Sequence, residues 1–174
     1  MSYKNLPRKR IVFLLIIIAA SYIFFFFNLG SYSLKEPDEG RYAEIPREMV
    51  ETGDYVVPHL NYVRYFEKPP LLYWITALSY RTFGINEWSF RFPNALFGLI
   101  GVVITFLFVA RWFNEKTAFI SSIILMSSFG FFAMARIVTI DMLFAVLLSI
   151  SLLCFFEFYQ KRHPLFLYLF FTTL

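Results

Sequence analysis

Long runs of uncharged, apolar residues alternate with short polar clusters along this 174-residue chain. The first three runs are each at least about 18 residues long, the length that a helix needs to cross a bilayer. The fourth reaches that length if Glu157 extends its carboxylate to the membrane surface. Helices are therefore predicted over 11–29, 92–110, 117–135, 139–159 and 165–174. The pattern predicts an all-α integral membrane protein, a polytopic bundle of helices.

The polar stretch 30–91 separates the first two predicted spans and is the largest interruption of the apolar pattern. Within it, Tyr42, Ile45 and Met49 recur at the spacing of one helix face, between charged positions. Such a segment is typical of an amphipathic helix that lies on a membrane surface. Gly53 is the expected end of this helix, because glycine tolerates the left-handed conformation found after helix ends.

The apolar segment Leu71–Phe83 has about 13 residues, too few for a normal membrane span. We expect it to lie along or partway into the outer interface, after an irregular loop over 59–70. If it crossed the membrane instead, every later helix would reverse its direction. Asp141 would then face the side opposite to Asp38 and could not share a site with it.

The composition of the chain is that of a membrane protein. Hydrophobic residues make up 59% and charged residues 16% of the chain, whereas soluble domains are about 25% charged. The single cysteine, Cys154, rules out a disulfide framework within the chain. The first apolar run is too long for a cleavable signal peptide and lacks a small-residue cleavage site.

Basic residues predict how the helices are oriented. Cytoplasmic loops are enriched in lysine and arginine, so the basic residues within 4–10 place the N-terminus in the cytoplasm. We interpret this group as a topogenic signal and not as a nucleic-acid patch, so nucleic acid is not an expected partner. The loop 30–91 then faces the periplasm or the cell exterior. Arg136 is the one residue near a predicted loop that this orientation leaves unexplained.

Three acidic residues are the first candidates for chemistry. Asp38 and Glu39 follow Pro37, which restricts the backbone before them, and such a carboxylate can act as a general base. Alternatively, the two acids cap the helix that follows. Asp141 opens the fourth predicted span, and an ionisable group at membrane depth is a functional candidate by default. Its alternative role is an N-terminal cap, shared with Thr139.

Two cations of the same loop are candidate phosphate ligands. Arg41 can bind a phosphate through two parallel hydrogen bonds, and Lys68 can act as a point charge. Two prolines directly after Lys68 favour a fixed presentation of its amine; pairing with Glu67 or snorkelling is the alternative. Glu67 could instead ligate a divalent cation with Asp38 or His59, although no cofactor is certain and no metal ligand set is assigned.

Three further arginines, Arg64, Arg81 and Arg91, are interpreted as anchors at the membrane surface and not as catalytic groups. The sequence contains no glycine-rich phosphate loop, no Cys/His zinc pattern and no nucleophile elbow. Candidate chemistry therefore rests on the carboxylates and cations of the outer loop.

Four ordered motifs carry a family resemblance. They are 36–44 (EPDEGRYAE), 65–71 (YFEKPPL), 87–93 (EWSFRFP) and 136–141 (RIVTID). In this order and at these places they resemble the bacterial aminoarabinose transferase group. That group belongs to the integral-membrane glycosyltransferases of the C-type fold and is related to protein O-mannosyltransferases. The resemblance covers nearly the whole chain, and 1–174 is expected to be the N-terminal portion of one transmembrane glycosyltransferase domain.

The resemblance implies a function and a set of site residues. Such enzymes take a sugar from a polyprenyl phosphate on the outer face of the inner membrane. The implied partners are this donor, a lipid A-like, glycan or protein acceptor, and membrane lipids. The family positions map onto Asp38, Glu39 and Asp141 as catalytic residues, and onto Arg41, Tyr42, Glu67 and Lys68 as substrate-binding residues.

Two interpretations without catalysis remain. A transporter or assembly segment explains the helices equally well, but transporters bury charges within their helices, and the first three runs carry none. An inactive, truncated relic of the enzyme also fits. The last run has about ten residues, too few to cross a hydrocarbon core roughly 30 Å thick. The chain is accordingly expected to be a fragment that has no transfer activity by itself.

Overall fold

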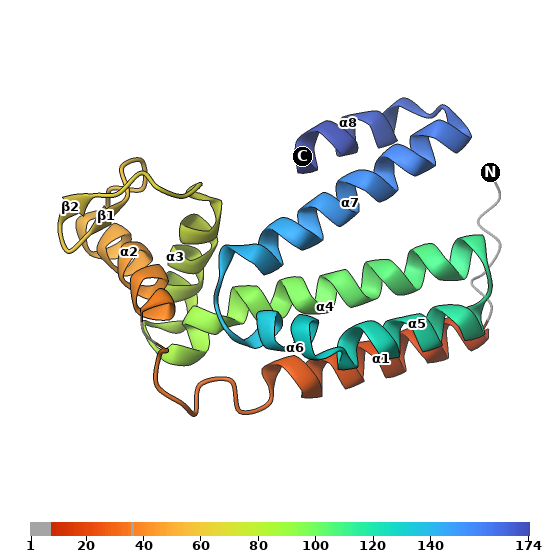
Figure 1. Cartoon of the computed structure of the whole chain (residues 1–174), viewed down its shortest axis with the longest axis horizontal. Helices are drawn as coiled ribbons and strands as arrows, with labels where there is room; N and C mark the ends of the chain where they lie inside the picture. The colour runs from red at the N-terminus through yellow and green to blue at the C-terminus, as the bar shows by residue number, and fades with distance from the viewer. Residues whose placement is uncertain (1–7, 36) are drawn as a thin grey trace.

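The described residues, 8–35 and 37–174, form eight helices and one two-stranded sheet in the computed structural model. Their order is α1 (Arg8–Phe26), α2 (Asp38–Thr52), β1 (His59–Leu60), β2 (Val63–Arg64), α3 (Leu71–Phe83), α4 (Glu87–Trp112), α5 (Glu115–Ser127), α6 (Phe129–Arg136), α7 (Ile140–Lys161) and α8 (Pro164–Thr173). Lys4 of the N-terminal basic group and Glu36 of the first motif lie outside the described residues. In Figure 1, α2, α3 and the two strands form a separate layer at one end of the long helices.

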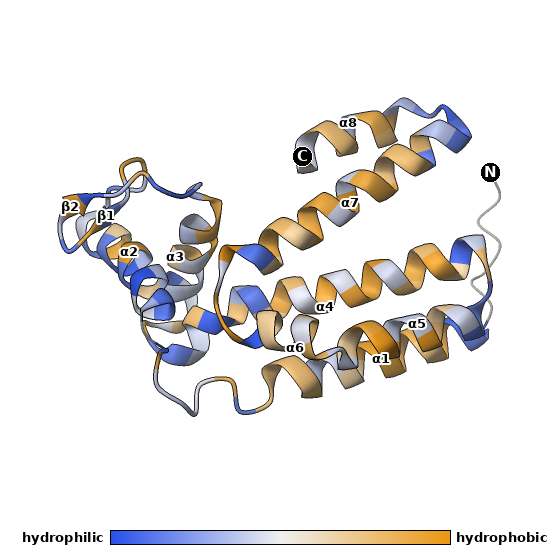
Figure 2. Ribbon diagram, in the orientation of Figure 1, coloured by the Kyte–Doolittle hydropathy of each residue, from blue (hydrophilic) through white to orange (hydrophobic). Residues whose placement is uncertain are grey.

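Three helices, α1, α4 and α7, are long and apolar enough to cross a membrane, and the bent pair of α5 and α6 can form a fourth span. Figure 2 shows these helices apolar along most of their length, with polar residues gathered at the two ends of the bundle. The all-α, polytopic class predicted from the sequence is confirmed.

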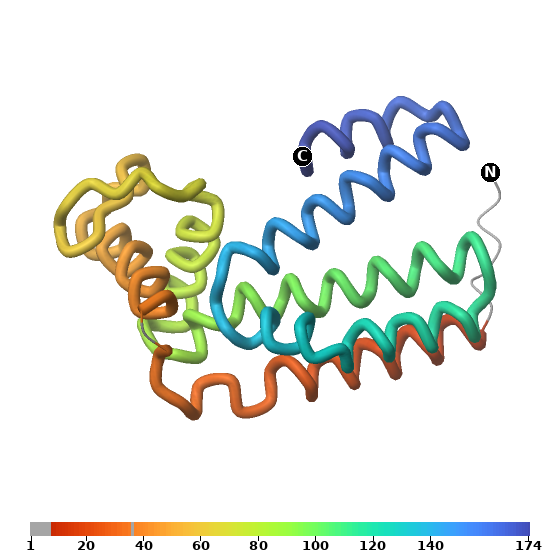
Figure 3. The backbone as a smooth tube through the Cα atoms, viewed as in Figure 1, coloured from red at the N-terminus to blue at the C-terminus, as the bar shows by residue number. Residues whose placement is uncertain are grey.

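The helix predicted over 117–135 is divided in the structure into α5 and α6, which meet at an angle of 63°. Ser128 between them is extended, with φ −65° and ψ 131°. The hydroxyls of Ser127 and Ser128 donate to the carbonyls of Ile123 and Leu125, each at 2.8 Å. Serine hydroxyls that bond to preceding carbonyls compete with the helix ladder and bend it. The bend is visible in the backbone trace of Figure 3. Hydropathy along the sequence cannot reveal it, because the segments on both sides of the bend are apolar.

The layer at one end of the long helices is built from two helices that cover each other. Ile45 and Met49 of α2 and Tyr73 of α3 are almost fully buried in one shared core. The apolar side of α2 is therefore covered by α3, and not by lipid as the amphipathic pattern predicted. Trp74 and Leu78 of α3 remain exposed, which suits a helix placed at a membrane interface.

Gly53 ends α2 as predicted. Its φ is 73°, and its N–H donates to the carbonyl of Met49 at 3.0 Å. Beyond it, the loop predicted over 59–70 is not wholly irregular, because β1 and β2 form an antiparallel hairpin in which His59 lies opposite Arg64.

The hairpin turn places two residues other than glycine in the left-handed region. Asn61 has a φ of 54° and Tyr62 a φ of 61°, as a two-residue turn of type I′ requires. The backbone N–H of Tyr62 donates to the buried carboxylate of Glu48 at 3.1 Å. This bond from α2 holds a tyrosine where the sequence pattern favours glycine.

Helix α4 lies close to α6 at Gly98. A Cβ added to Gly98 would lie 2.8 Å from the Cβ of Ala135 and 3.5 Å from the ring of Phe25. Both neighbours are fully buried. Small residues let helix backbones come close together within a membrane, and Gly98 is the position that allows α1, α4 and α6 to meet.

Gly98→Ala is therefore expected to lower the free energy of unfolding by about 1–3 kcal/mol, the range for overpacking a filled interior. Gly130→Ala is the matched control on α6, because nothing lies within 4 Å of an added Cβ there and alanine favours a helix. Thermal unfolding in detergent micelles measures both. Equal melting temperatures for Gly98→Ala and the unsubstituted chain would contradict the close approach.

Candidate functional site

Glu39 of α2 and Arg91 of α4 form a fully buried ion pair at the end of the bundle that carries the α2–α3 layer. The Nε and Nη2 groups of Arg91 donate to the two carboxylate oxygens at 3.0 and 2.8 Å. Its remaining N–H groups donate at 3.2, 2.8 and 3.1 Å to the carbonyls of Leu29, Tyr32 and Ser33. All five donors of the guanidinium are used, and the Tyr32 ring centre lies 3.9 Å from its central carbon.

The carboxylate of Glu39 accepts four hydrogen bonds. Two come from Arg91, and the backbone N–H groups of Lys35 and Val138 donate the others at 2.9 and 3.1 Å. Burial alone would raise the pKa of Glu39, but the hydrogen bonds from Arg91 and from the two backbone groups lower it below its usual value. The group therefore stays ionised in the interior.

These positions change two predicted roles. Glu39 was predicted as a catalytic acid, but its fully buried carboxylate is occupied by four donors and has no surface to offer a substrate. Arg91 was predicted as an anchor at the membrane surface, but it is the centre of the buried network. We assign both residues to positioning the site.

Of the two neighbouring acids Asp38 and Glu39, Asp38 is the exposed one. Its side chain is 63% exposed, and its Oδ1 accepts from Nη2 of Arg41 at 3.2 Å. The cap position of α2 is Pro37, which offers no side-chain hydrogen bond, so the predicted capping role of Asp38 is not seen. The carboxylate faces outward with a cation beside it.

Three tyrosines surround Arg41. The rings of Tyr42 and Tyr73 lie 6.2 Å apart, and the hydroxyl of Tyr65 donates to Glu67 at 3.0 Å. The hydroxyl of Tyr73 is buried and has no partner among the residues that the structure describes. Tyr65 and the negative charge of Glu67 raise the pKa of Arg41, so its guanidinium keeps its charge.

Asp141 lies in the first turn of α7, exposed, and pairs with no other described residue through a hydrogen bond or salt bridge. Thr139 occupies the cap position without a side-chain capping bond, so a shared cap is not seen. Burial raises the pKa of Tyr42, and the nearby charges of Asp38 and Asp141 raise it further. Tyr42 shares one apolar core with Val138 and Leu143, which lie on either side of Asp141 in the chain, so both acids lie at the same end of the bundle.

The turn that leads to Asp141 is held by Asn94, a fully buried residue of α4. Its Nδ2 donates at 3.0, 3.1 and 3.4 Å to the carbonyls of Met134, Ile137 and Thr139. Sequence reasoning missed this residue. The signal was present, because an amide inside an apolar run is costly unless it has a specific partner.

Arg136 fastens the same turn to α1. Its Nη1 donates to the carbonyls of Phe24 and Phe27, at 3.0 and 2.9 Å. The hydroxyl of Tyr32 donates to the carbonyl of Arg136 at 3.1 Å. A cation at a helix C-terminus satisfies unpaired carbonyls and complements the helix dipole. This role accounts for the basic residue that the predicted orientation left unexplained.

Lys68 lies in the exposed loop before α3 and forms no hydrogen bond or ion pair with any residue in 8–35 or 37–174. Glu67 accepts from Tyr65 instead of pairing with Lys68. Within the described part of the chain, no three His, Cys, Asp or Glu side chains come together as a metal site. Glu67, Asp38 and His59 therefore form no described ligand set for a divalent cation.

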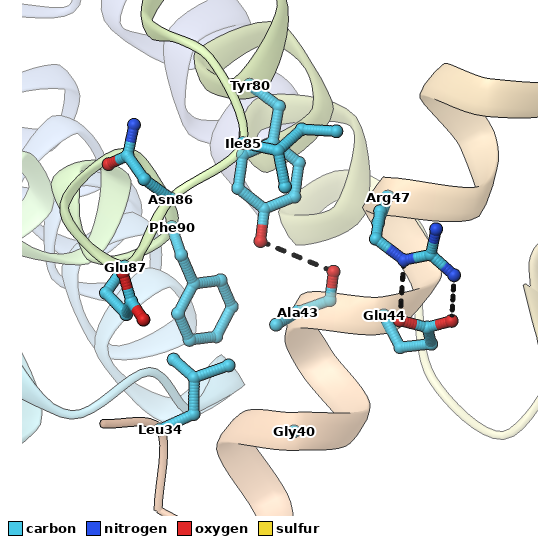
Figure 4. A pocket seen from close by; sticks show the side chains of 10 residues that line it. All are labelled: Leu34, Gly40, Ala43, Glu44, Arg47, Tyr80, Ile85, Asn86, Glu87 and Phe90. Carbon is cyan, nitrogen blue, oxygen red and sulfur yellow. Dashed lines mark hydrogen bonds and ion pairs between the residues drawn. The ribbon is translucent and has the colours of Figure 1, made fainter.

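A hollow of about 430 Å³ opens between α2 and the junction of α3 with α4 (Figure 4). The hydroxyl of Tyr80 donates to the carbonyl of Ala43 across it at 3.4 Å, and Arg47 pairs with Glu44 at its edge. None of the predicted site residues lines this hollow. Arg41 lines a second, open hollow of about 410 Å³ beside the hairpin. The exposed acids thus lie on an open surface.

Comparison with known proteins finds relatives of this chain. The family model for dolichyl-phosphate-mannose-protein mannosyltransferase matches residues 67–174. The chain is 38% identical over 131 residues to undecaprenyl phosphate-alpha-4-amino-4-deoxy-L-arabinose arabinosyl transferase 2 of Proteus mirabilis, covering 75% of this chain and 24% of that protein. The corresponding transferase of Photorhabdus laumondii is 39% identical, with 71% and 22% covered.

Two solved structures share the fold. The crystal structure of ArnT from Cupriavidus metallidurans in the apo state matches with a TM-score of 0.78 at 34% identity, covering 88% of this chain and 28% of that one. The same protein bound to undecaprenyl phosphate matches with a TM-score of 0.77 at 36% identity, with 82% and 26% covered.

The fold is that of the integral-membrane glycosyltransferase class. The chain belongs to the dolichyl-phosphate-mannose-protein mannosyltransferase family. The resemblance to aminoarabinose transferases that the four motifs indicated is confirmed. The chain spans about a quarter of the length of these relatives.

Replacing Arg91 by methionine is expected to lower the free energy of unfolding by about 3–5 kcal/mol, because Glu39 would remain as a buried charge without its partner. The double variant Glu39→Met with Arg91→Met should recover part of this loss, since no charge then stays buried. Denaturant unfolding in detergent measures both. Arg81→Met is the control, because Arg81 is exposed and pairs with no described residue. An equal effect of Arg91→Met and Arg81→Met would contradict the central role of the pair.

Proposed function

We propose that this chain forms the donor side of a membrane glycosyltransferase, which moves a sugar from a polyprenyl phosphate to a lipid A-like, glycan or protein acceptor. The observation that carries the proposal is that Asp38 and Arg41 of α2 lie at the same end of the bundle as Asp141 of α7. Tyr42, which follows Arg41, shares one apolar core with Val138 and Leu143 on either side of Asp141. Relatives that are named arabinosyl transferases, and a structural neighbour bound to undecaprenyl phosphate, support it.

The proposed reaction is an inverting sugar transfer in which the polyprenyl phosphate leaves. The acceptor oxygen forms a bond to the anomeric carbon while the bond from that carbon to the phosphate oxygen breaks. Arg41 and Lys68 stabilise the negative charge that develops on the phosphate. Both side chains are accessible, and neither is enclosed by the buried network.

The two exposed carboxylates have separate tasks in this proposal. Asp38 accepts the proton of a hydroxyl acceptor as a general base. If the acceptor is a phosphate, it is already ionised, and Asp38 then orients it. Asp141 supplies the second carboxylate at the reacting end. Glu67 is exposed and accepts from Tyr65, whereas Tyr42 is buried and packs against Tyr73.

We propose the bacterial inner membrane as the location, with the N-terminus in the cytoplasm and the α2–α3 layer outside. Figure 1 places the start of α1, the α4–α5 connection and the α7–α8 connection at the end opposite that layer. Arg10 links two of them, donating to Glu115 at 3.1 Å. The basic residues at this end are Arg8, Lys9, Arg10, Arg111, Lys116, Lys161 and Arg162. Such an excess favours the cytoplasmic side.

Asp38→Asn is expected to lower turnover by about 10²- to 10⁴-fold, because an amide cannot take the proton of the acceptor. The assay uses a chimera in which this chain replaces the matching quarter of the Cupriavidus metallidurans protein. Undecaprenyl phosphate-linked 4-amino-4-deoxy-L-arabinose and lipid A serve as probes. Glu51→Gln is the matched control, since Glu51 is an exposed acid of the same helix. Full activity of Asp38→Asn would show that the catalytic assignment is wrong.

Cysteine labelling tests the proposed orientation. In a Cys154→Ser background, cysteines that replace Tyr62 and Asp141 should react with a membrane-impermeant thiol reagent in intact cells, because both positions are exposed at the outer end. A cysteine replacing His163, in the connection before α8, should react only after lysis. Labelling of Asp141→Cys only after lysis would separate Asp141 from Asp38 and break the shared site.

A further inference from the structure

Arg91 and Asn94 are two fully buried polar side chains on the same helix, α4. Residues three positions apart lie on the same helix face. Arg91 holds the segment that leads to Asp38, through the carbonyls of the loop after α1 and through Glu39. Asn94 holds the turn that leads to Asp141, through three backbone carbonyls.

Neither exposed acid is fixed by its own side chain. Asp38 has one exposed ion pair, with Arg41, and such pairs contribute little to stability. Asp141 makes no hydrogen bond or ion pair with the residues that the structure describes. Their separation is therefore determined by the backbone segments that carry them, and α4 holds both segments.

A direct bond also joins the two segments. The N–H of Val138, three residues before Asp141, donates to Oε1 of Glu39 at 3.1 Å. Glu39 directly follows Asp38 in the chain. The buried carboxylate thus touches Arg91 of α4 on one side and the backbone before α7 on the other.

We propose that Arg91 and Asn94 are positioning residues that set the distance between Asp38 and Asp141. The catalytic consequence rests on the proposed function: one rigid helix presents both carboxylates to the same substrate in a fixed relation. A misplacement of about 1 Å at a reacting centre can cost about 10²-fold in rate. Loss of the hydrogen bonds made by Arg91 or by Asn94 should therefore lower kcat more than it raises KM for the donor.

Asn94 is the sharper of the two positions to test, because it is uncharged and its removal leaves no buried ion. Asn94→Leu keeps a similar volume but removes both amide hydrogens. Three carbonyls of the α6–α7 turn then lose this donor. Asn94→Ser, a smaller polar side chain that does not reach the turn, is the second variant in case the leucine variant does not fold.

The measurement is the distribution of distances between two spin labels in a Cys154→Ser background. One label is attached at Lys35→Cys, three residues before Asp38, and the other at Phe144→Cys, one turn after Asp141. Both labelled positions are exposed. The distribution should be narrow in the reference chain and broader in the Asn94 variants. Asn86→Ala is the matched control: it removes the capping box of α4 and so weakens the helix start, but touches neither acid-bearing segment. It should leave the distribution narrow.

The activity arm uses the chimera described above and should show kcat lower by about 10²-fold in the Asn94 variants, with KM for the donor little changed. A narrow distribution in a folded Asn94 variant would overturn the proposal, whether or not the chimera transfers sugar. A broadened distribution with unchanged kcat would also overturn it, since the acids would then need no fixed relation. Failure of the proposed function is seen separately, as a chimera with the unsubstituted chain that transfers no sugar.

Discussion

The buried pair of Glu39 and Arg91 is the interaction on which the outer end of this protein depends. An arginine removed from water is strongly unfavourable unless every donor finds a partner. Here all five donors do: the acceptors are three loop carbonyls and the two carboxylate oxygens of Glu39, one of which also accepts from Val138. The chain after α1, the first turn of α2, and the turn before α7 are joined at this point.

This polar centre specifies an arrangement that apolar packing alone leaves open. Within a membrane, lipid tails are as apolar as leucine, so hydrophobicity does not choose between helix contacts. The close approach at Gly98 limits how near α4 and α6 come. The forked hydrogen bonds of Arg91 and the amide of Asn94 then select one register, because a shift along α4 would leave buried donors and carbonyls unpaired.

The sequence predicted the helical spans well, because they depend on local signals. Span length and hydropathy are local, and so are the four motifs. The break at Ser128 was missed, since both halves of the span are apolar and the break arises from two serine hydroxyls that bond to preceding carbonyls. The hairpin was missed because Asn61 and Tyr62 adopt a left-handed backbone without glycine, and the N–H of Tyr62 is bound by Glu48 of α2, 14 residues earlier.

The roles of the neighbours Asp38 and Glu39 show where local reasoning ends. Adjacent residues on a helix point about 100° apart, so one of the two must face inward. The apolar positions Tyr42, Ile45 and Met49 already mark the inward face, and Glu39 precedes Tyr42 by three residues on that face. Assigning it to the interior required a buried cation opposite, and Arg91 lies 52 positions later in the chain.

The exposed acids and the residues that hold them are separate parts of the structure. Hydrogen bonds among the described residues fix both acid-bearing segments. They are made by Arg91, Asn94 and Glu39 and need no further part of the chain. The surface that carries the acids is open, and the hollows beside it are lined by other residues. The chain matches about a quarter of the length of its relatives. In the proposed enzyme, the positions of the two carboxylates are therefore determined within this segment. The described residues do not enclose the reacting sugar.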